Sequence, residues 1–371
     1  MSKELKEKEY TTHIMGNPSN TSESATWSEI LSQPDIWQKV LQSPEVHSTV
    51  DALLGAARDR TTWLYVGCGT SYYLAEAAAL TAMKLTGRPA RVLPASEVLL
   101  QPELVRAEGG KLQAVVISRS GKTSEAVRAA AALRDDLRVP TFGITCAQQS
   151  PLEKACDQTL VLHQADESST VMTRSFTSML LALQLLAARR AGNQAFVREL
   201  SAMAAAFSPQ LSALADRIRN FVQSHQFEDY VFLAQGASYG IAREAALKVM
   251  EMSCSYSQFF HTLEFRHGPK AIVSAETCLT FYLDEPGYQA EAEVLAEMKQ
   301  LGGVNFTICN RATESVRNAS DFLVELDLPA SELGLLAPSV VPSQLLGLFT
   351  GLRKGLNPDA PKNLTRVVML D

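Results

Sequence analysis

The chain repeats part of its own sequence. Laying residue 63 on residue 230, an offset of 167, aligns WLYVGCGTSYYLAEAAAL with YVFLAQGASYGIAREAAL and brings Gly69 onto Gly236. Each copy reads as a buried strand, a glycine turn and an Ala-rich helix. The similarity therefore predicts a duplicated α/β unit, and the alternative is a chance likeness between two Ala-rich helices.

Short β-branched or aromatic runs alternate with longer Ala- and Leu-rich stretches through both copies. This alternation predicts an α/β fold in which parallel sheets carry helices on both faces. The predicted strands of the first copy are Trp63–Val66, Ala90–Leu93, Ala114–Ile117, Thr141–Ile144 and Thr159–Leu162. Those of the second copy are Tyr230–Leu233, Leu279–Leu283, Asn305–Cys309 and Phe322–Leu326.

The length of 371 residues allows two domains or a little more, at roughly 150 residues each. Hydrophobic residues make up 46% of the chain and charged residues 20%, which are proportions of a folded protein. We expect a flexible polar arm at residues 1–25 and helices at 26–46. A first α/β domain is expected at 47–205 and a second at 206–371.

Charge and composition exclude several classes of protein. The net charge of −6 gives no overall positive field for nucleic acid or an anionic membrane surface, so an anionic ligand must be small and held locally. The apolar run Met179–Ala188 is about half of a membrane span and is expected to be a buried helix. The cysteines form no CxxC pair and MSKELKEKEY lacks a signal core, which favours a cytoplasmic protein. The histidines lack metal-ligand spacing, so no metal is expected.

Two glycine loops resemble nucleotide-binding motifs but depart from them. Gly67-Cys68-Gly69 follows a predicted strand, yet the third glycine position of a dinucleotide motif is Tyr72, and no strand-end acid follows about 20 residues later. Gly121-Lys122-Thr123 resembles the end of a P-loop, but the earlier glycine position is Val116. Neither a dinucleotide nor a nucleoside triphosphate is therefore expected.

A hydroxyl-rich loop is the best candidate for holding an anion. SRSGKT, residues 118–123, follows a predicted strand and precedes a helix that begins near Ser124. Hydroxyls, backbone N–H groups and the positive helix end can hold a phosphate monoester without a metal. Alternatively Thr123 or Ser124 simply caps the helix, although capping uses only one or two of the hydroxyls. Asp284 and Glu285 stand at the equivalent strand end of the second half and would repel an anion, so only the first half is expected to bind phosphate.

Glu244, Lys248 and Glu251 have i, i+4, i+7 spacing and lie on one face of a predicted helix. The ordinary interpretation is a solvated stripe of salt bridges. However, AALKVMEMSCSY is otherwise apolar or small, so Val249, Met250 and Met252 are expected to be buried around the acid. Burial raises the pKa of a carboxyl, which suits a general base.

His267 stands in RHGPK, where Gly268-Pro269 ends any regular element and leaves the imidazole on a loop. A loop histidine is either catalytic or an ordinary surface residue, and local sequence leaves both open.

Five motifs, in order along residues 26–371, together resemble the sugar isomerase (SIS) family, in particular the isomerase half of glucosamine-6-phosphate synthase. They are GCGTSYY, ISRSGKTSEA, AALKVMEMSCSY, FRHGPKAI and PKNLTRVVMLD. The resemblance implies two tandem flavodoxin-like subdomains and a homodimer with sites at the subunit interface. It also implies a sugar 6-phosphate ligand and no cofactor.

The resemblance also implies roles for individual residues. It makes Glu251 the base that moves a proton between C1 and C2, Lys248 the group that stabilises an enol-type intermediate, and Glu244 a supporting acid. His267 would open the sugar ring from the other subunit. The residues implied to hold phosphate are Ser71, Ser118, Arg119, Ser120 and Thr123.

Two departures from the synthase pattern narrow the expected activity. The synthase has a glutaminase domain with an N-terminal cysteine, whereas residue 2 here is Ser2 and the arm is too short for a domain. A tail lysine of the synthase aligns with Arg366, and a guanidinium cannot form a Schiff base. Arg366 could instead close over the substrate and neutralise its oxyanion or phosphate. Arg119 and Phe265-Arg266-His267 fit the amino-sugar-6-phosphate deaminase branch better.

These observations predict an enzyme that acts on an open-chain 2-amino-2-deoxyhexose 6-phosphate and yields a ketose 6-phosphate and ammonia. With a hydroxy sugar, the same proton transfer gives an aldose–ketose isomerase. A fructosamine-6-phosphate deglycase is a further possibility within the family. A non-catalytic sugar-phosphate sensor is the contrasting class, but it usually needs a DNA-binding or partner domain and need not keep Glu251, Lys248 and His267 together.

Overall fold

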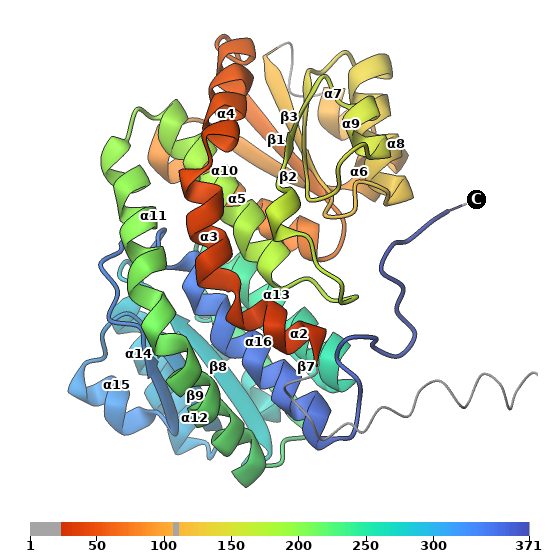
Figure 1. The fold of residues 1–371 in the computed structure, drawn as a ribbon. Coiled ribbons are helices and arrows are strands. Elements are labelled where there is room, and N and C mark those ends of the chain that lie inside the picture. The colour runs from red at the N-terminus through yellow and green to blue at the C-terminus, as the bar shows by residue number, and fades with distance from the viewer. Residues whose placement is uncertain (1–23, 107–110, 371) are drawn as a thin grey trace, which may run out of the picture.

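The computed structural model describes residues 24–106 and 111–370, which fold into two α/β halves joined by helices (Figure 1). Every strand pairing in the two sheets is parallel. The first sheet contains β1 (Thr62–Gly67), β2 (Ala90–Pro94), β3 (Leu112–Ile117), β4 (Thr141–Thr145) and β5 (Gln158–Val161). The second contains β6 (Asp229–Ala234), β7 (Tyr256–His261), β8 (Thr277–Leu283), β9 (Val304–Cys309) and β10 (Phe322–Glu325).

The two sheets have the same topology. The first has the order β2-β1-β3-β4-β5, and the second, read from its β7 edge, has the order β7-β6-β8-β9-β10. Both are the 2-1-3-4-5 order of flavodoxin-like folds. Strand β6 begins and ends 167 residues after β1, and the turns that follow contain Gly69 and Gly236 with φ of 52° and 55°. The predicted duplication is confirmed, and chance similarity of helices does not account for it.

Each predicted strand overlaps an observed one, but β7 was not predicted. It is the edge strand of the second sheet, and Tyr256 and His261 at its ends are exposed. Its sequence, YSQFFH, mixes polar and aromatic residues and lacks the continuous apolar run of a buried strand. The preceding helix ends at Cys254 in the left-handed conformation, with φ of 48°, so the chain turns directly into the strand.

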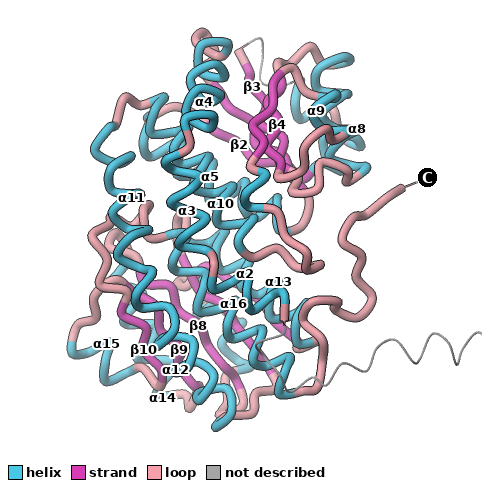
Figure 2. Tube along the Cα trace, viewed as in Figure 1, coloured by secondary structure: helices cyan, strands magenta, loops and turns pink. Residues whose placement is uncertain are grey.

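Helices cover both faces of the sheets, as expected for this fold class (Figure 2). The first half contains α2 (Ala25–Leu31), α3 (Gln33–Gln42), α4 (Pro44–Ala56), α5 (Thr70–Thr86), α6 (Ala95–Leu100), α7 (Glu103–Arg106), α8 (Ser124–Ala131), α9 (Pro151–Ala155), α10 (Arg174–Arg190) and α11 (Gln194–Phe207). The second contains α12 (Leu211–Ser224), α13 (Ser238–Ser253), α14 (Tyr288–Gln300), α15 (Glu314–Ala319) and α16 (Leu336–Arg353). Short helical turns are η2 (Ala132–Asp136), η3 (His163–Ala165), η4 (Ser208–Gln210), η5 (Glu264–Arg266) and η6 (Pro269–Ile272).

The N-terminal helices lie near the predicted range. The arm expected at residues 1–25 falls outside the described residues except for Ser24, which caps α2, and Ala25, which begins it. Helix α11 packs on α3, whereas α12 packs on α16. This packing supports a domain boundary between α11 and α12, which we retain as a proposal.

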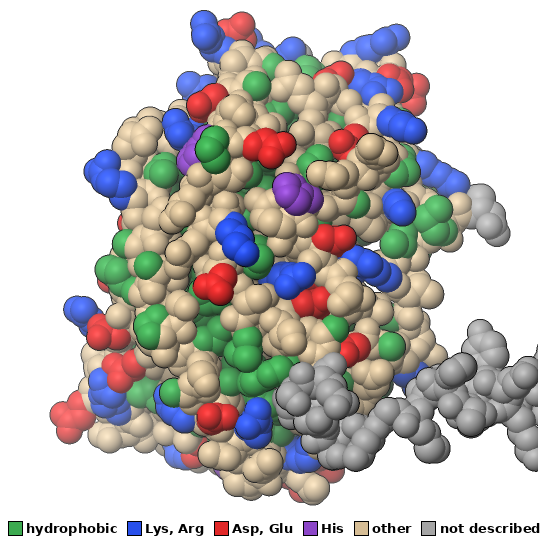
Figure 3. Space-filling view, viewed as in Figure 1, with side chains coloured by type: hydrophobic (Ala, Val, Ile, Leu, Met, Phe, Trp, Pro, Cys, Tyr) green, Lys and Arg blue, Asp and Glu red, His purple; other side chains and the backbone are tan. Residues whose placement is uncertain are grey.

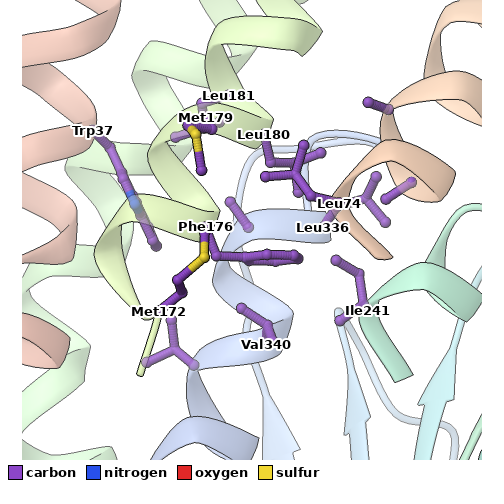
Figure 4. Close-up of a cluster of buried hydrophobic side chains, with 14 of the residues drawn as sticks. Trp37, Leu74, Met172, Phe176, Met179, Leu180, Leu181, Ile241, Leu336 and Val340 are labelled. Atoms are coloured by element: carbon purple, nitrogen blue, oxygen red, sulfur yellow. The ribbon is translucent and has the colours of Figure 1, made fainter. Parts of the chain in front are cut away.

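One hydrophobic core connects the two halves. The fully buried side chain of Phe176, on α10, lies among Leu74 of α5, Ile241 of α13 and Val340 of α16 (Figure 4). The run Met179–Ala188 is buried in α10, as predicted. Helices α5 and α13, which are equivalent in the repeat, thus pack together at the centre of the molecule.

Close approach of α5 and α13 depends on Gly240. A Cβ at this position would lie 2.7 Å from the carbonyl oxygen of Tyr73 and 2.9 Å from the backbone nitrogen of Ala77. Both distances are too short for a side chain to fit without backbone movement. The glycine therefore fixes the distance between the first turn of α5 and the face of α13 that carries the predicted acids.

The helices and the surface charge bear on two functions that the sequence argues against, membrane insertion and binding to nucleic acid. Among the described residues, no helix combines the length and apolar character needed to cross a membrane. On the face drawn in Figure 3, basic and acidic side chains are interspersed instead of gathering in a single basic patch.

Candidate active site

A cavity of about 220 Å³ lies at the carboxyl ends of β1 and β3, the edge of a parallel sheet at which α/β proteins bind ligands. Five segments contribute to its wall: the turn before α5, the loop before α8, the loop before α10, one face of α13 and the C-terminal tail. The lining residues are Cys68, Gly69, Thr70, Ser71, Ile117, Ser118, Arg119, Ser120, Thr123, Ala126, Thr170, Met172, Lys248, Glu251, Leu364, Thr365, Arg366 and Val368.

Four residues of the hydroxyl-rich loop, Ser118, Arg119, Ser120 and Thr123, line the cavity together with Ser71. Thr123 is the residue before α8, but its side chain makes no capping hydrogen bond, so the capping interpretation fails for this hydroxyl. Ser118 Oγ lies 3.5 Å from Thr123 Oγ1. Gly121 has φ of 59°, and a Cβ there would collide with the side chain of Ser150. The loop thus presents several hydroxyls beside a helix N-terminus, an arrangement that suits a phosphate.

The side chain of Arg119 has several protein partners beside the cavity, and its role as a phosphate ligand stays a prediction. Its guanidinium is buried and donates hydrogen bonds to the carbonyl oxygens of residues 169–171 and of Arg366, over 3.0 to 3.4 Å. It also lies 3.5 Å from the carboxylate of Glu167. These contacts let the guanidinium brace two segments of the cavity wall, which Arg119 also lines.

Lys248 is the central group of the α13 face. Its side chain is fully buried, and Nζ donates to Glu251 Oε2 and, over 3.2 Å, to Thr70 Oγ1. Glu244 Oε1 lies 3.4 Å from the same nitrogen. A lysine at 0% exposure is not part of a solvated stripe, so the ordinary interpretation of this spacing is excluded. The three predicted residues form one buried charged cluster with α5.

Burial and charge shift the titration of this cluster. Burial raises the pKa of Glu244 to about 8, against the lowering effect of Lys248, and the negative charge of Glu251 adds to the rise. Burial acts to lower the pKa of Lys248, but the two carboxylates outweigh it and the pKa is raised. Near neutral pH, Lys248 is therefore charged and Glu244 holds a proton for much of the time.

Glu251 and Arg366 both reach the cavity. The side chain of Glu251 is 17% exposed, unlike that of Glu244, which is at 0%. The expectation that both methionines of this segment are buried is wrong for Met250, which is 45% exposed, and right for Met252.

Arg366 donates to Asp166 Oδ1 over 2.9 Å and to the carbonyl oxygen of Glu167. These two hydrogen bonds hold the C-terminal tail on the loop before α10.

His267 does not line the cavity of this chain. It is exposed and lies on the turn between η5 and η6, where its backbone N–H donates to the carbonyl oxygen of Glu264 over 2.9 Å. The structure therefore brings together Ser71, the 118–123 loop, Glu244, Lys248, Glu251 and Arg366, and leaves His267 outside.

Sequence reasoning missed three parts of the wall: Thr70, the Thr170–Met172 segment and the tail residues that flank Arg366. The second had a usable signal. The polar run DESST, residues 166–170, follows a predicted strand and precedes a buried helix, so it stands near the carboxyl edge of the sheet. The tail stands out only through the family motif PKNLTRVVMLD, because nothing local relates it to a strand end.

Comparison with known proteins agrees with this fold. The SIS domain model matches residues 58–189 and 226–347, one segment in each half of the molecule. The chain belongs to the SIS family. Each matched segment of this SIS protein contains one of the two sheets, so the internal repeat is a pair of SIS domains.

Relatives of this SIS protein have several activities. Glutamine–fructose-6-phosphate aminotransferase (isomerizing) from Pyrobaculum aerophilum is 27% identical over 358 residues, which cover 92% of this chain and 57% of that protein. The chain thus spans just over half the length of the curated relatives it matches. The structure of glucosamine-6-phosphate deaminase from Thermotoga maritima has a TM-score of 0.75 and 28% identity, and covers 94% of this chain and 100% of that one. Tagatose-6-phosphate ketose/aldose isomerase from Escherichia coli, with a TM-score of 0.79 and 22% identity over 92% of this chain and 96% of that one, shares the fold.

Proposed function

We propose that this SIS protein is an amino-sugar-6-phosphate deaminase that also carries out the aldose–ketose isomerisation of its substrate. One observation carries the proposal: a buried lysine, Lys248, binds a carboxylate that faces a cavity, and the same cavity is lined by a hydroxyl-rich loop at a helix N-terminus. The similarity to solved phosphosugar enzymes, including the deaminase from Thermotoga maritima, supports this substrate class.

The phosphate of the substrate would bind at the hydroxyl loop with Ser71. The hydroxyls of Ser118, Ser120 and Thr123 can donate to phosphate oxygens, and the N-terminus of α8 adds a favourable partial charge. This loop and Glu251 line the same cavity, so a six-carbon chain anchored by its 6-phosphate can bring C1 and C2 to the carboxylate.

The carboxylate of Glu251 would take the proton from C2 of the open-chain amino sugar while O1 takes a proton from the ammonium of Lys248, which Glu244 beside it can reprotonate, and the product is an enaminol. The same carboxyl then returns the proton to C1, and C2 becomes a protonated imine. Water adds to C2 and ammonia leaves, so that the product is a ketose 6-phosphate. The ammonium of Lys248 stabilises the charge that develops on O1, and protonated Glu244 supplies a nearby proton store.

Arg366 supports ammonia release over transfer of nitrogen to a ketose. Its guanidinium cannot form the Schiff base that a lysine forms, and in this chain it is bound to Asp166 and Glu167. We also propose a homodimer in which His267 of a second copy completes the site and opens the sugar ring. His267 is exposed and does not line the cavity of its own chain, and both observations support this part.

One assay separates the candidate activities. Purified protein is incubated separately with the 6-phosphates of glucosamine, galactosamine, fructose, tagatose and fructosamine, and ammonia and sugar products are measured. Ammonia together with a ketose 6-phosphate supports the deaminase. Interconversion of hydroxy sugars without ammonia would make the protein a plain isomerase, and release of glucose 6-phosphate and an amine from the fructosamine would make it a deglycase. Tight binding with no turnover of any of them would make it a sensor.

A further inference from the structure

We propose that Glu29, on helix α2, is a positioning residue for the sugar-side wall of the cavity, the loop of residues 168–172. Helix α2 lies outside both segments that the SIS domain model matches. The inference deepens the proposed function, because it concerns how the substrate is held in the same site. Glu29 does not line the cavity and would act through the loop.

The carboxylate of Glu29 is 3% exposed and accepts four hydrogen bonds from two consecutive serines. Oε1 accepts from the backbone N–H of Ser168 (2.6 Å), from its hydroxyl (3.0 Å) and from the backbone N–H of Ser169 (3.2 Å). Oε2 accepts from the hydroxyl of Ser169. A buried carboxylate is stable only when hydrogen-bond donors surround it. Because all four donors belong to Ser168 and Ser169, the position of Glu29 on α2 constrains the position of the loop.

Arg119 holds the same loop through its carbonyl groups. The guanidinium donates to the carbonyl oxygens of Ser169, Thr170 and Val171, whereas Glu29 accepts from the N–H groups at the start of the loop. The N–H groups at the start of the loop therefore point toward the carboxylate of Glu29, and the carbonyl groups that follow point toward the guanidinium of Arg119. This arrangement defines one position of the loop between two buried, opposite charges.

A third set of hydrogen bonds connects the N-terminus of α2 to the segment after α16. The carboxylate of Asp359 accepts from Ser24 Oγ and from the backbone N–H groups of Ala25 and Thr26, over 2.8 to 2.9 Å. The carbonyl oxygen of Asp359 accepts from the N–H of Thr170 over 3.0 Å. Helix α2, the loop and the segment after α16 thus form one hydrogen-bonded unit. Thr170 and Met172 belong to this unit and line the cavity, so a shift of the unit changes the cavity wall.

The position of the loop predicts which kinetic constants a substitution of Glu29 should change. The hydroxyl loop at residues 118–123 contacts residues 169–171 through the side chain of Arg119. Its backbone is held separately, because Ser118 N–H donates to the carbonyl oxygen of Ile144 and Cys146 N–H donates to that of Arg119. We therefore expect displacement of residues 168–172 to leave the phosphate contacts in place. The Glu29→Gln substitution removes the negative charge toward which the two serine N–H groups point, and only one of its two terminal atoms can still accept a hydrogen bond. Loss of the wall weakens ground-state and transition-state binding alike. We expect KM for the sugar phosphate to rise about tenfold, with kcat within about threefold and the affinity for inorganic phosphate unchanged.

A matched control is available on another helix. Glu199 of α11 accepts from the backbone N–H of Ser331 (2.7 Å) and from its hydroxyl (2.5 Å), but neither residue lines the cavity. The Glu199→Gln substitution should leave KM and kcat unchanged. The Ser169→Ala substitution removes one donor to Glu29 and should raise KM in the same direction by a smaller factor. The double variant of Glu29 and Ser169 should then be less impaired than the product of the two effects.

The test combines kinetics with amide hydrogen exchange in the ligand-free protein. In Glu29→Gln, the amides of residues 168–171 should exchange at least about tenfold faster, while the melting temperature stays close to that of Glu199→Gln. Unchanged KM together with unchanged exchange would overturn the inference, and so would an equal effect of Glu199→Gln. If wild-type protein turns over no sugar phosphate, the proposed function fails, and the exchange experiment still decides the role of Glu29. If Glu29→Gln does not fold, Ser169→Ala gives the decision.

Discussion

The ammonium nitrogen of Lys248 lies 3.4 Å from a carboxylate oxygen of Glu244, and both side chains are fully buried. The same nitrogen donates to Glu251, which faces the cavity. One lysine thus links an acid that lines the cavity to an acid that does not. In the proposed mechanism the first acid moves the proton and the second is a shielded proton store, and this relationship leads to predictions that mutation and pH can test.

The close contact between α5 and α13 predicts a contrast between two glycines. The Gly240→Ala substitution introduces a Cβ 2.7 Å from the carbonyl oxygen of Tyr73, so the helices must separate, and Thr70 must move away from Lys248. We expect a loss of about 1–3 kcal/mol in the free energy of unfolding. Gly55 lies in α4 with no atom within 4 Å of its Cβ position, so Gly55→Ala should be neutral or stabilising by up to about 1 kcal/mol. Urea unfolding checks both, and equal effects would contradict the packing argument.

The buried state of Glu244 predicts how stability changes with pH. Burial raises its pKa from an ordinary value of 4.5 to about 8, so the folded protein keeps this proton over a range where the unfolded chain has lost it. Its contribution to stability is therefore full below pH 4.5 and is lost as the pH rises through 8, by at most about 1.4 kcal/mol per pH unit. The Glu244→Gln variant should lose less stability between pH 5 and 8 than wild type.

The pKa values of two other acids, the buried Glu291 and the half-buried Asp284, are shifted in the same direction and set the background of that experiment. Burial raises the pKa of Glu291 to about 8 and that of Asp284 to about 7. Wild type and Glu244→Gln should therefore both become less stable as the pH rises, with the variant showing the shallower slope. An exposed acid provides the control, and Glu285→Gln should keep the wild-type slope. Parallel slopes for wild type and Glu244→Gln would be inconsistent with a raised pKa at Glu244.

Two threonines before helices should respond in opposite ways to substitution by valine. Thr123 makes no capping hydrogen bond and lines the cavity, so Thr123→Val should weaken inorganic phosphate binding about five- to tenfold and barely change stability. Thr313 caps α15 by accepting from the N–H of Val316 and lies elsewhere, so Thr313→Val should cost about 0.5–2 kcal/mol of stability and leave phosphate binding unchanged. Calorimetric titration and thermal unfolding measure the two effects. A loss of stability without loss of binding at Thr123 would return this residue to a structural role.

The fold could be predicted from the sequence because its main signals are local and repeated. Buried parallel strands leave continuous apolar runs, and the match around Gly69 and Gly236 relates two such runs across the chain. Strand β7 has no such run, since it lies at a sheet edge and is exposed at both ends. The repeat could still have predicted this strand. Strand β2 of the first half begins at Ala90, and the offset of 167 residues places its equivalent near residue 257.

The candidate site was partly predictable for the same reason. Helical spacing brings Glu244, Lys248 and Glu251 onto one face wherever the helix lies. The contacts of Glu29 with Ser169 and of Arg119 with Arg366 join residues 140 and 247 positions apart, and no local pattern records them. Arg119 therefore looked like a phosphate ligand in the sequence, while its carbonyl partners are contributed by tertiary structure.

The most direct test of the account is the Glu251→Gln substitution, measured with whichever amino-sugar 6-phosphate the wild-type protein turns over. Calorimetric titration gives binding, and release of ammonia in deuterated water, with deuterium analysed at C1 of the product, gives proton transfer. If Glu251 carries the proton between C2 and C1, kcat should fall about 10³-fold while the dissociation constant for the sugar phosphate stays within about threefold. Retention of more than about a tenth of wild-type turnover, with the same deuterium content at C1, would show that another group is the base and would contradict the central claim.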